Sequence, residues 1–386
     1  MSTQTTNVDE HSAVSLDMDA SVPKDLAKLR ILLVHDWIVA WGGAERTVEQ
    51  MLTVLPQATL VVGVLGDGKR NFNDVTRRAA ETWLARLPGA RTHHRWLLPL
   101  YPAAFASIDT RGYDLIISSS SAFSKAVRPR RGTPHLCYCY TPPRYLWDLR
   151  AEYGRDGSNA GRALSIAGPA LRAVDRMSAR SVTKFVAISH HIADRIARAY
   201  HRESSVVYPP VARKPCTTRV AARGNALLSL SRLVPYKRVD LAVLAANRLG
   251  AELIVAGDGP EREYLQSIAG PTVTFIGEVT EEVAGNLLES SRAMIFCADE
   301  DFGIAPVEAN AHGLPVIAYN RGATRESLVD GRTAVFFDEA TPESLCAAIQ
   351  HAEGVSWDEE VIRANAARFS RERFRGAFAD EVRSIV

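Results

Sequence analysis

The stretch Ile31-Leu-Leu-Val-His-Asp-Trp-Ile-Val-Ala-Trp-Gly42-Gly43-Ala-Glu-Arg-Thr-Val-Glu-Gln-Met-Leu52 indicates the fold class of this chain. Its first four residues are an apolar run typical of a buried strand, and the residues after the two glycines have a helical pattern. A strand, a glycine-rich turn and a helix make the first unit of a doubly wound parallel sheet. Glycine at this turn lets the backbone approach a phosphate at a helix N-terminus, although a tight turn alone also explains it.

This turn does not have the glycine spacing of a dinucleotide-binding fingerprint. It is not G-x-G-x-x-G, and no acidic residue ends a second strand about 20 residues later, as a ribose contact would require. A dehydrogenase is therefore disfavoured.

The strand and helix pattern occurs twice along the chain. Tyr208-Pro-Pro-Val-Ala-Arg-Lys-Pro215 reads as a rigid, extended linker, and strands alternate with helices on both sides of it. This predicts two Rossmann-like doubly wound domains that face a cleft. The predicted parts are a disordered tail (1–25), an N-terminal domain (26–207), the linker (208–215), a C-terminal domain (216–370) and a helix that returns to the N-terminal domain (371–386).

Composition narrows the class of protein further. The 386 residues exceed what one core usually supports, and the net charge is only +2. From Arg86 to Arg176, however, 14 Lys/Arg stand against 6 Asp/Glu, interleaved with aromatic residues. Such a region suits an anionic partner such as a membrane surface or a lipid-linked diphosphate, although a solvated arginine-rich face explains it equally well.

The cysteines and the N-terminal residues indicate a cytoplasmic protein. Five cysteines without a regular framework predict a reducing compartment and no disulfide scaffold. No apolar run approaches the ~20 residues of a membrane span, and the first 25 or so residues lack the apolar core of a signal peptide.

The segment Ala298-Asp-Glu-Asp-Phe-Gly-Ile-Ala-Pro-Val-Glu-Ala-Asn-Ala-His-Gly-Leu-Pro315 places two acids, Glu300 and Glu308, eight positions apart after an apolar strand. We expect Glu300 in a loop at the carboxyl end of that strand, and a helix over 307–312 that starts just after Pro306. Both acids then face the crevice where open α/β sheets bind ligands. The N–H groups placed for an anion such as a diphosphate are those of Gly303, Ile304 and Ala305.

The pattern alone leaves three interpretations of the two acids. They form a carboxylate pair that flanks a glycosidic bond, or one binds a ribose and the other a transferred sugar, or they are ion-paired with Arg232 or Lys237. These two cations follow the first strand of the second domain, where they could clamp a negatively charged leaving group. Further loops at strand ends that could approach a ligand contain Gly257, Asp258 and Gly277.

Glu300-Asp-Phe-Gly-Ile-Ala-Pro-Val-Glu308 resembles the E-x(7)-E signature of glycosyltransferase family 4, a large retaining group with the GT-B fold. The turn at Gly42-Gly43, the loop Ser231-Arg-Leu-Val-Pro-Tyr-Lys237 and the later glycine motifs follow that family's order and spacing over residues from about 30 to 380. The resemblance extends to bacterial mannosyltransferase-like members that build polysaccharide repeat units, through Tyr140-Thr-Pro-Pro-Arg-Tyr-Leu-Trp-Asp148.

This resemblance implies a role for each candidate residue. Arg232 and Lys237 would neutralise the diphosphate as it leaves, and no metal or other cofactor would be needed. Glu308 would bind the ribose hydroxyls, and Glu300 the hydroxyls of the transferred sugar. Retention would arise by front-face attack with the leaving phosphate as the base, although a double displacement on Glu300 stays open. The other implied contacts to the nucleotide sugar are Gly42, Gly43, Gly257, Asp258, Gly277, Phe302, Gly303, Ile304 and Ala305.

One position departs from the family pattern. Tyr140 stands where many relatives have a histidine that touches the transferred sugar. A tyrosine can hydrogen-bond a sugar hydroxyl but does not act as a base near neutral pH. The sequence therefore leaves open whether Tyr140 changes the activity or the choice of sugar.

Three functions remain as hypotheses at this stage. The favoured one is a hexosyltransferase that moves mannose from GDP-mannose to a lipid-diphosphate-linked saccharide, as a peripheral protein at the inner membrane face. A catalytically silent nucleotide-sugar-binding protein and a GT-B-like nucleotide-sugar epimerase are the alternatives. No nucleic-acid partner is expected.

Overall fold

The computed structural model describes residues 23–68, 72–147, 159–214, 216 and 222–386, so most of the predicted tail lies outside the described residues. The chain forms two compact units. One comprises Met1–Cys137, Tyr145–Lys184 and Val382–Val386, and the other comprises Tyr138–Arg144 and Phe185–Glu381. The sheets do not follow this division, because residues 185–206 of the second unit contribute strands to the sheet of the first domain.

The first domain is built on a parallel sheet with seven strands among the described residues, in the order β3-β2-β1-β4-β5-β6-β7. Strand β1 pairs in parallel with β2 and β4, with Leu33 opposite Leu60 and Ile117. Two short outer strands, β3 and β7, were not predicted. The strands are β1 (Ile31–His35), β2 (Thr59–Val62), β3 (Ala80–Glu81), β4 (Leu115–Ser120), β5 (His135–Cys139), β6 (Lys184–Ala187) and β7 (Ser204–Val206).

Helices connect these strands, as parallel pairing requires. The core on one face packs Leu32 and Val34 of β1 against Phe105, Phe123 and Leu171. The helical segments are α1 (Gly43–Val54), α2 (Asp74–Arg78), η1 (Trp83–Arg86), η2 (His94–Leu100), α3 (Tyr101–Ala106), η3 (Ser124–Ala126), α4 (Arg144–Trp147), α6 (Asn159–Ala179) and α7 (His190–Tyr200).

The second domain has a parallel sheet with six strands in the described part of the chain, in the order β10-β9-β8-β11-β12-β13. Numbered within the domain, this is the doubly wound order 3-2-1-4-5-6, in which the winding reverses between β8 and β11. The strands are β8 (Leu227–Leu230), β9 (Leu253–Ala256), β10 (Val273–Gly277), β11 (Ala293–Phe296), β12 (Val316–Tyr319) and β13 (Ala334–Phe337).

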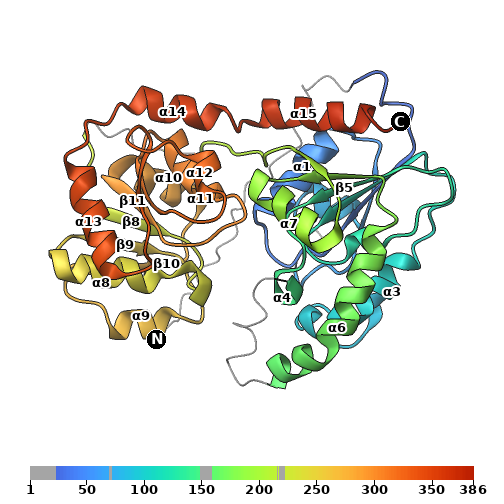
Figure 1. Cartoon of the computed structure of the whole chain (residues 1–386), viewed down its shortest axis with the longest axis horizontal. Coiled ribbons are helices and arrows are strands. Elements are labelled where there is room, and N and C mark those ends of the chain that lie inside the picture. Colours follow the sequence, from blue (N-terminus) through green and yellow to red (C-terminus); the bar gives the residue numbers. More distant parts are fainter. Residues whose placement is uncertain (1–22, 69–71, 148–158, 215, 217–221) are drawn as a thin grey trace, which may run out of the picture. The chain divides into compact units, whose positions relative to one another are not determined.

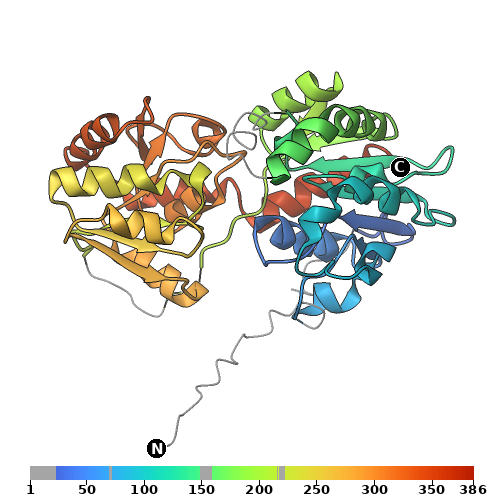
Figure 2. The ribbon, with the colours of Figure 1, turned by 90° about the horizontal axis from the view of Figure 1, so that it is seen from below.

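Helices cover both faces of this sheet. On one face α8 packs beside α13, as Figures 1 and 2 show, and on the other face α11 packs against α14. The helical segments are η4 (Pro235–Lys237), α8 (Val239–Leu249), α9 (Arg262–Ser267), α10 (Glu281–Ser290), α11 (Ile304–Ala311), α12 (Thr324–Ser327), α13 (Pro342–Glu353), α14 (Glu359–Ala367) and α15 (Arg371–Arg383). The prediction of two Rossmann-like, doubly wound domains is confirmed.

One local prediction needs correction. Helix α11 begins at Ile304 rather than after Pro306, because Gly303 adopts a left-handed conformation (φ 82°) and caps the helix there. Proline is tolerated in the first turn, where a backbone N–H has no intrahelical acceptor. The helix predicted from residue 371 corresponds to α15.

Residues 207–214 form neither helix nor strand, in keeping with an extended linker. Within the described residues, none of the helices combines the length and the sustained apolar character that a membrane span needs.

Candidate functional site

The loops that follow β8 and β11 meet at the reversal point of the second sheet. Lys237, at the end of the β8 loop, places its Nζ 2.5 Å from Oε1 of Glu300 in the β11 loop. The lysine side chain is 17% exposed and the glutamate side chain 20%. An open parallel sheet binds its ligand at this point, outside the carboxyl ends of the strands. Two of the predicted site residues are therefore adjacent and form an ion pair with each other.

A second cation stands at the same loop without a carboxylate partner. The side chain of Arg232 is exposed, and among the described residues it forms no ion pair. Lys237 also lies 5.6 Å from the centre of the Phe296 ring. The β8 loop thus offers one solvated guanidinium and one half-buried ammonium to an anion.

The glycine-containing loop after β9 packs directly against the loop after β8. Gly257 has φ 132°, and a Cβ there would come within 1.9 Å of the Ser231 carbonyl oxygen. The Leu233 N–H donates to the Asp258 carbonyl over 3.0 Å, and the Gly257 N–H donates to the Gly277 carbonyl over 2.7 Å. Glycine at 257 therefore lets the two loops touch, which sets the position of Arg232 and Lys237.

The side chain of Asp258 is engaged locally. It accepts hydrogen bonds from the Gly259 N–H at 2.7 Å and from Arg262 Nη1 at 2.8 Å. The Gly259 N–H and the Arg262 guanidinium hold the pKa of Asp258 below its usual range. Gly277, with φ 76°, lies beside the same arginine. These residues shape the loop, and their predicted contact with a ligand stays a prediction.

The start of α11 presents its first turn at the same edge of the sheet. Gly303 is the N-cap, so Ile304 and Ala305 are the first two helical residues and have no intrahelical acceptor for their N–H groups. The ring of Phe302 is 2% exposed and packs 5.3 Å from Phe369. Its side chain is therefore a packing group, and only its backbone can reach a ligand.

Glu308 lies one turn further along α11 and has a partner that the sequence did not predict. Its carboxylate, 6% exposed, is 3.0 Å from Nζ of Lys214 in the extended segment before the second domain. A basic residue in that segment was visible in the sequence, but the acid that it meets depends on the path of the chain.

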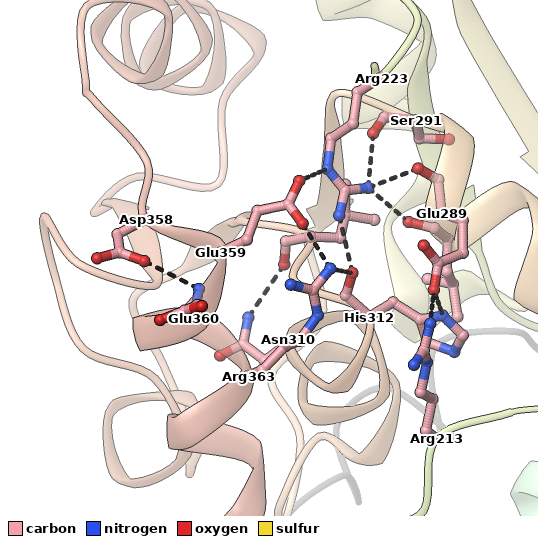
Figure 3. Close-up of polar contacts among 12 residues, drawn as sticks. Arg213, Arg223, Glu289, Ser291, Asn310, His312, Asp358, Glu359, Glu360 and Arg363 are labelled. Carbon is pink, nitrogen blue, oxygen red and sulfur yellow. Dashed lines mark hydrogen bonds and ion pairs between the residues drawn. The ribbon is translucent and has the colours of Figure 1, made fainter. Parts of the chain in front are cut away.

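The C-terminal end of α11 is held by a polar network (Figure 3). Arg223 Nη2 donates to the His312 carbonyl over 2.8 Å, and its Nη1 donates to the carbonyls of Leu288 and Glu289. His312 Nδ1 lies 3.0 Å from Glu289, which also pairs with Arg213. Helix carbonyls at a C-terminus need such donors, so this network fixes the helix that carries Glu308.

In the first domain, the turn before α1 is already occupied by an internal anion. Glu45 accepts a hydrogen bond from the Gly42 N–H over 2.9 Å, and its other oxygen lies 3.9 Å from His35 Nε2. An acid at a helix N-terminus is favourable there. Any phosphate that binds at Gly43 therefore meets a carboxylate beside it.

The reversal point of the first sheet, between β1 and β4, is closed by Asp36. Its carboxylate accepts hydrogen bonds from the backbone N–H groups of four successive residues, at 2.5 to 2.9 Å. The four residues that donate to Asp36 are Ser121, Ala122, Phe123 and Ser124.

Tyr140 directly follows β5. Its side chain is 9% exposed and lies edge-on to the ring of Tyr138.

Within the described residues, no three His, Cys, Asp or Glu side chains gather as a metal site would require. Of the charged residues predicted for the site, Glu300 and Glu308 are each paired with a lysine, and Arg232 forms no ion pair with any residue that the structure describes.

Comparison with known proteins places this arrangement in a family. Residues 41–213 match the model of glycosyltransferase family 4, and residues 218–368 match that of glycosyl transferases group 1. The chain belongs to this group of glycosyltransferases. The first match ends within the linker and the second begins after it, so each domain of the glycosyltransferase has its own counterpart in the family.

Relatives and solved structures agree with this assignment. The glycosyltransferase is 31% identical over 182 residues to a GDP-mannose-dependent alpha-mannosyltransferase of Mycolicibacterium smegmatis, covering 46% of this chain and 48% of the relative. It is 27% identical over 212 residues to a GDP-mannose-dependent alpha-(1-6)-phosphatidylinositol monomannoside mannosyltransferase of Mycobacterium tuberculosis, covering 47% and 55%. The chain thus spans about half the length of the curated relatives that it matches.

The solved structure of Anabaena HepE in complex with UDP superposes with a TM-score of 0.67 at 17% identity, covering 92% of this chain and 100% of that one. At this identity the likeness shows the fold alone, which is GT-B.

Proposed function

We propose that this glycosyltransferase is a retaining, metal-independent hexosyltransferase that moves mannose from GDP-mannose to a lipid-diphosphate-linked saccharide. The observation that carries the proposal is the set of charged groups at the reversal point of the second sheet. Glu300 and Glu308 lie on the loop and the helix that follow β11, and Arg232 and Lys237 lie on the loop that follows β8. This is the distribution of charge that a nucleotide sugar needs, with hydroxyls at one end and a diphosphate in the middle.

In this proposal the diphosphate replaces Glu300 as the partner of Lys237. The ammonium then faces the bond that breaks, and Arg232 neutralises the phosphate from the solvent side. Glu300, released from the lysine, accepts hydrogen bonds from the hydroxyls of the sugar. The first-turn N–H groups of Ile304 and Ala305 bind a sugar or phosphate oxygen.

We propose further that retention follows front-face attack, with the departing phosphate as the base that takes the acceptor proton. Lys237 supports this route, since an ammonium on the departing diphosphate stabilises the charge that develops there. Tyr140 would hydrogen-bond the sugar without acting as a base.

The choice of mannose and GDP rests on the relatives. Both mannosyltransferases described above are named for their dependence on GDP-mannose. The alignments cover about half of each relative, so the donor nucleotide and its sugar are the first points to test.

The acceptor and the membrane are proposed from the basic region over 86–176. It contains Trp96, which is 79% exposed, in a stretch from 82 to 108 that has no acidic residue. An indole at the surface beside arginines suits an interface with anionic lipid, and we place the enzyme at the cytoplasmic face.

Calorimetry with GDP, UDP and ADP, followed by transfer assays with the matching nucleotide sugars, tests the donor. We expect GDP to bind tightest and mannose to be transferred with retained anomeric configuration, in buffer with EDTA. Preferred binding of UDP would refute the mannose assignment and leave the reaction class intact.

Two variants test the chemistry. Glu300→Gln should lower transfer by about 100-fold or more, because a sugar contact made in the transition state is lost. Glu282→Gln, an exposed acid on α10, is the matched control and should be fully active. Binding without any transfer by the wild type would favour the silent protein, and a new epimer formed without acceptor would favour the epimerase.

A further inference from the structure

Glu300 and Glu308 each form an ion pair with a lysine, and one of these lysines does not lie in a loop that follows a strand of the second sheet. Lys237 follows β8, as the family motif implies. Lys214 lies instead in the extended segment 207–214, and its Nζ is 3.0 Å from Oε2 of Glu308. Both side chains are largely buried, at 15% exposed for the lysine and 6% for the glutamate. Burying a carboxylate is costly unless a cation and hydrogen bonds compensate, so this lysine is a substantial part of the environment of Glu308.

The segment that carries Lys214 is fastened along α11. The Val211 N–H donates to the Phe369 carbonyl over 2.8 Å, at the end of α14. Arg213, next in sequence to the lysine, pairs with Glu289, and Glu289 holds His312 at the C-terminal end of α11 (Figure 3). The backbone before and at Lys214 is thereby held, which limits the directions from which its ammonium can approach Glu308.

We propose that Lys214 is a positioning residue for the nucleotide, acting through Glu308. It holds the carboxylate in the orientation that accepts the two ribose hydroxyls, and it compensates the buried charge when water is displaced by the ligand. The inference rests on the proposed role of Glu308 as the ribose contact.

A merely structural counterion would give a different result. It would stabilise the fold, and its loss would weaken every nucleotide to the same extent. A residue that acts through Glu308 matters only when ribose hydroxyls are present. The ratio of affinities for a ribonucleotide and its 2′,3′-dideoxy analogue therefore separates the two roles, because damage to the fold cancels from the ratio.

The experiment is calorimetry on the full chain with GDP and 2′,3′-dideoxy-GDP, repeated with the uridine pair. In the wild type the hydroxyls should strengthen binding about tenfold or more, the effect of one or two charge-assisted hydrogen bonds. Lys214→Met should reduce this preference to about twofold or less and leave the affinity for the dideoxy analogue nearly unchanged. Lys214→Arg should restore most of the preference, since it returns a cation to the same place.

Arg248→Met is the matched control, because it removes a surface cation whose carboxylate is Glu343, away from Glu308 and from the contacts that hold Lys214. Its preference for the ribonucleotide should equal that of the wild type. An unchanged preference in Lys214→Met, with the preference lost in Glu308→Gln, would overturn the inference alone. Equal binding of both nucleotides by the wild type would refute the ribose role of Glu308 and the inference with it, and absence of nucleotide binding would refute the proposed function.

Discussion

Lys237 Nζ and Glu300 Oε1 lie 2.5 Å apart, and this ion pair joins the loop after β8 to the loop after β11. These two loops flank the point where the winding of the second sheet reverses. A ligand that binds there must exchange one ionic contact for another. Because Glu300 compensates its charge, the lysine can lie at this edge largely buried and still exchange its partner for an anion.

Lys237→Met should weaken binding of a nucleoside diphosphate about tenfold and leave binding of the matching nucleoside unchanged. The reason is that its ammonium would contact only the diphosphate. Calorimetry with GDP and guanosine measures both. Arg248→Met, which removes a surface cation paired with Glu343, is the control. Equal losses for GDP and guanosine would contradict the proposed contact.

Gly257→Ala should destabilise the second domain by about 2 kcal/mol or more and weaken nucleotide binding. Its φ of 132° disfavours any L side chain, and the added Cβ would overlap the Ser231 carbonyl. The β8 loop, with its two cations, would have to move. Urea unfolding and calorimetry report the two effects.

Gly376→Ala is a control of opposite sign. A Cβ at Gly376 meets nothing within 4 Å, and the residue lies inside α15. The helix propensity of alanine should stabilise this variant by about 0.5 to 1 kcal/mol. If both glycine variants lose the same stability, close contact at 257 is not the cause.

The parts of the fold that could be predicted are those in which local pattern and burial coincide. The strand at Leu253–Ala256 is an apolar run followed directly by glycine, as is typical of a strand covered on both faces. Strands β3 and β7 contain two and three residues, too few to show a period. The start of α11 was predicted too late because proline is typical of the first turn of a helix, and Pro306 was taken to mark the start. The left-handed conformation of Gly303, which caps the helix, cannot be predicted from the neighbouring residues.

The charge partners within the site could be predicted only in part. The sequence predicted Arg232 or Lys237 as the ion-pair partner of Glu300. The prediction was possible because the cations follow one strand and Glu300 follows another, and these two strands are neighbours in a doubly wound sheet. The contact of Lys214 with Glu308 depends on how an irregular segment runs along α11, and no periodic signal encodes such a path.

Arg223→Ala should lower the free energy of unfolding of the second domain by about 2 to 4 kcal/mol. The guanidinium donates to four carbonyl oxygens, and each of these hydrogen bonds would be lost. Arg223→Lys should recover only part of this, because an ammonium lacks the planar fork. Urea unfolding measures the series, with the exposed Arg321→Ala as a neutral control. Full stability of the lysine variant would show that charge alone suffices.

Asp175→Asn should destabilise the first domain by about 3 to 5 kcal/mol. Asp175 and Lys125 are both fully buried, with Oδ1 and Nζ 2.6 Å apart, so the variant leaves the lysine without its buried carboxylate. Adding Lys125→Met should restore part of the stability, because the buried charge is then gone. Urea unfolding can be followed by fluorescence, since Trp147 Nε1 donates to Asp175. A double variant less stable than Asp175→Asn would contradict this account.

His135 should make the first domain less stable as the pH falls below about 6.5. The imidazole is fully buried, with Nε2 2.8 Å from Ser118 Oγ, and burial lowers its pKa to about 3. The unfolded chain therefore takes up a proton near pH 6.5 that the folded chain refuses until about pH 3. The stability that neutral His135 allows is complete above the unfolded pKa. It is lost at up to about 1.4 kcal/mol per pH unit as the pH falls towards the folded pKa.

His135→Gln tests this, because glutamine does not titrate and still offers an amide to Ser118. The free energy of unfolding in urea, measured between about pH 7.5 and about pH 5, should fall less steeply for the variant, by about 2 kcal/mol over that interval. The window lies above the titration of Asp109 and Asp114, whose arginine partners hold their pKa values at about 2. Other buried histidines, such as His312, contribute equally to both proteins and cancel in the difference. Parallel curves for wild type and variant would mean that the folded chain accommodates a protonated His135.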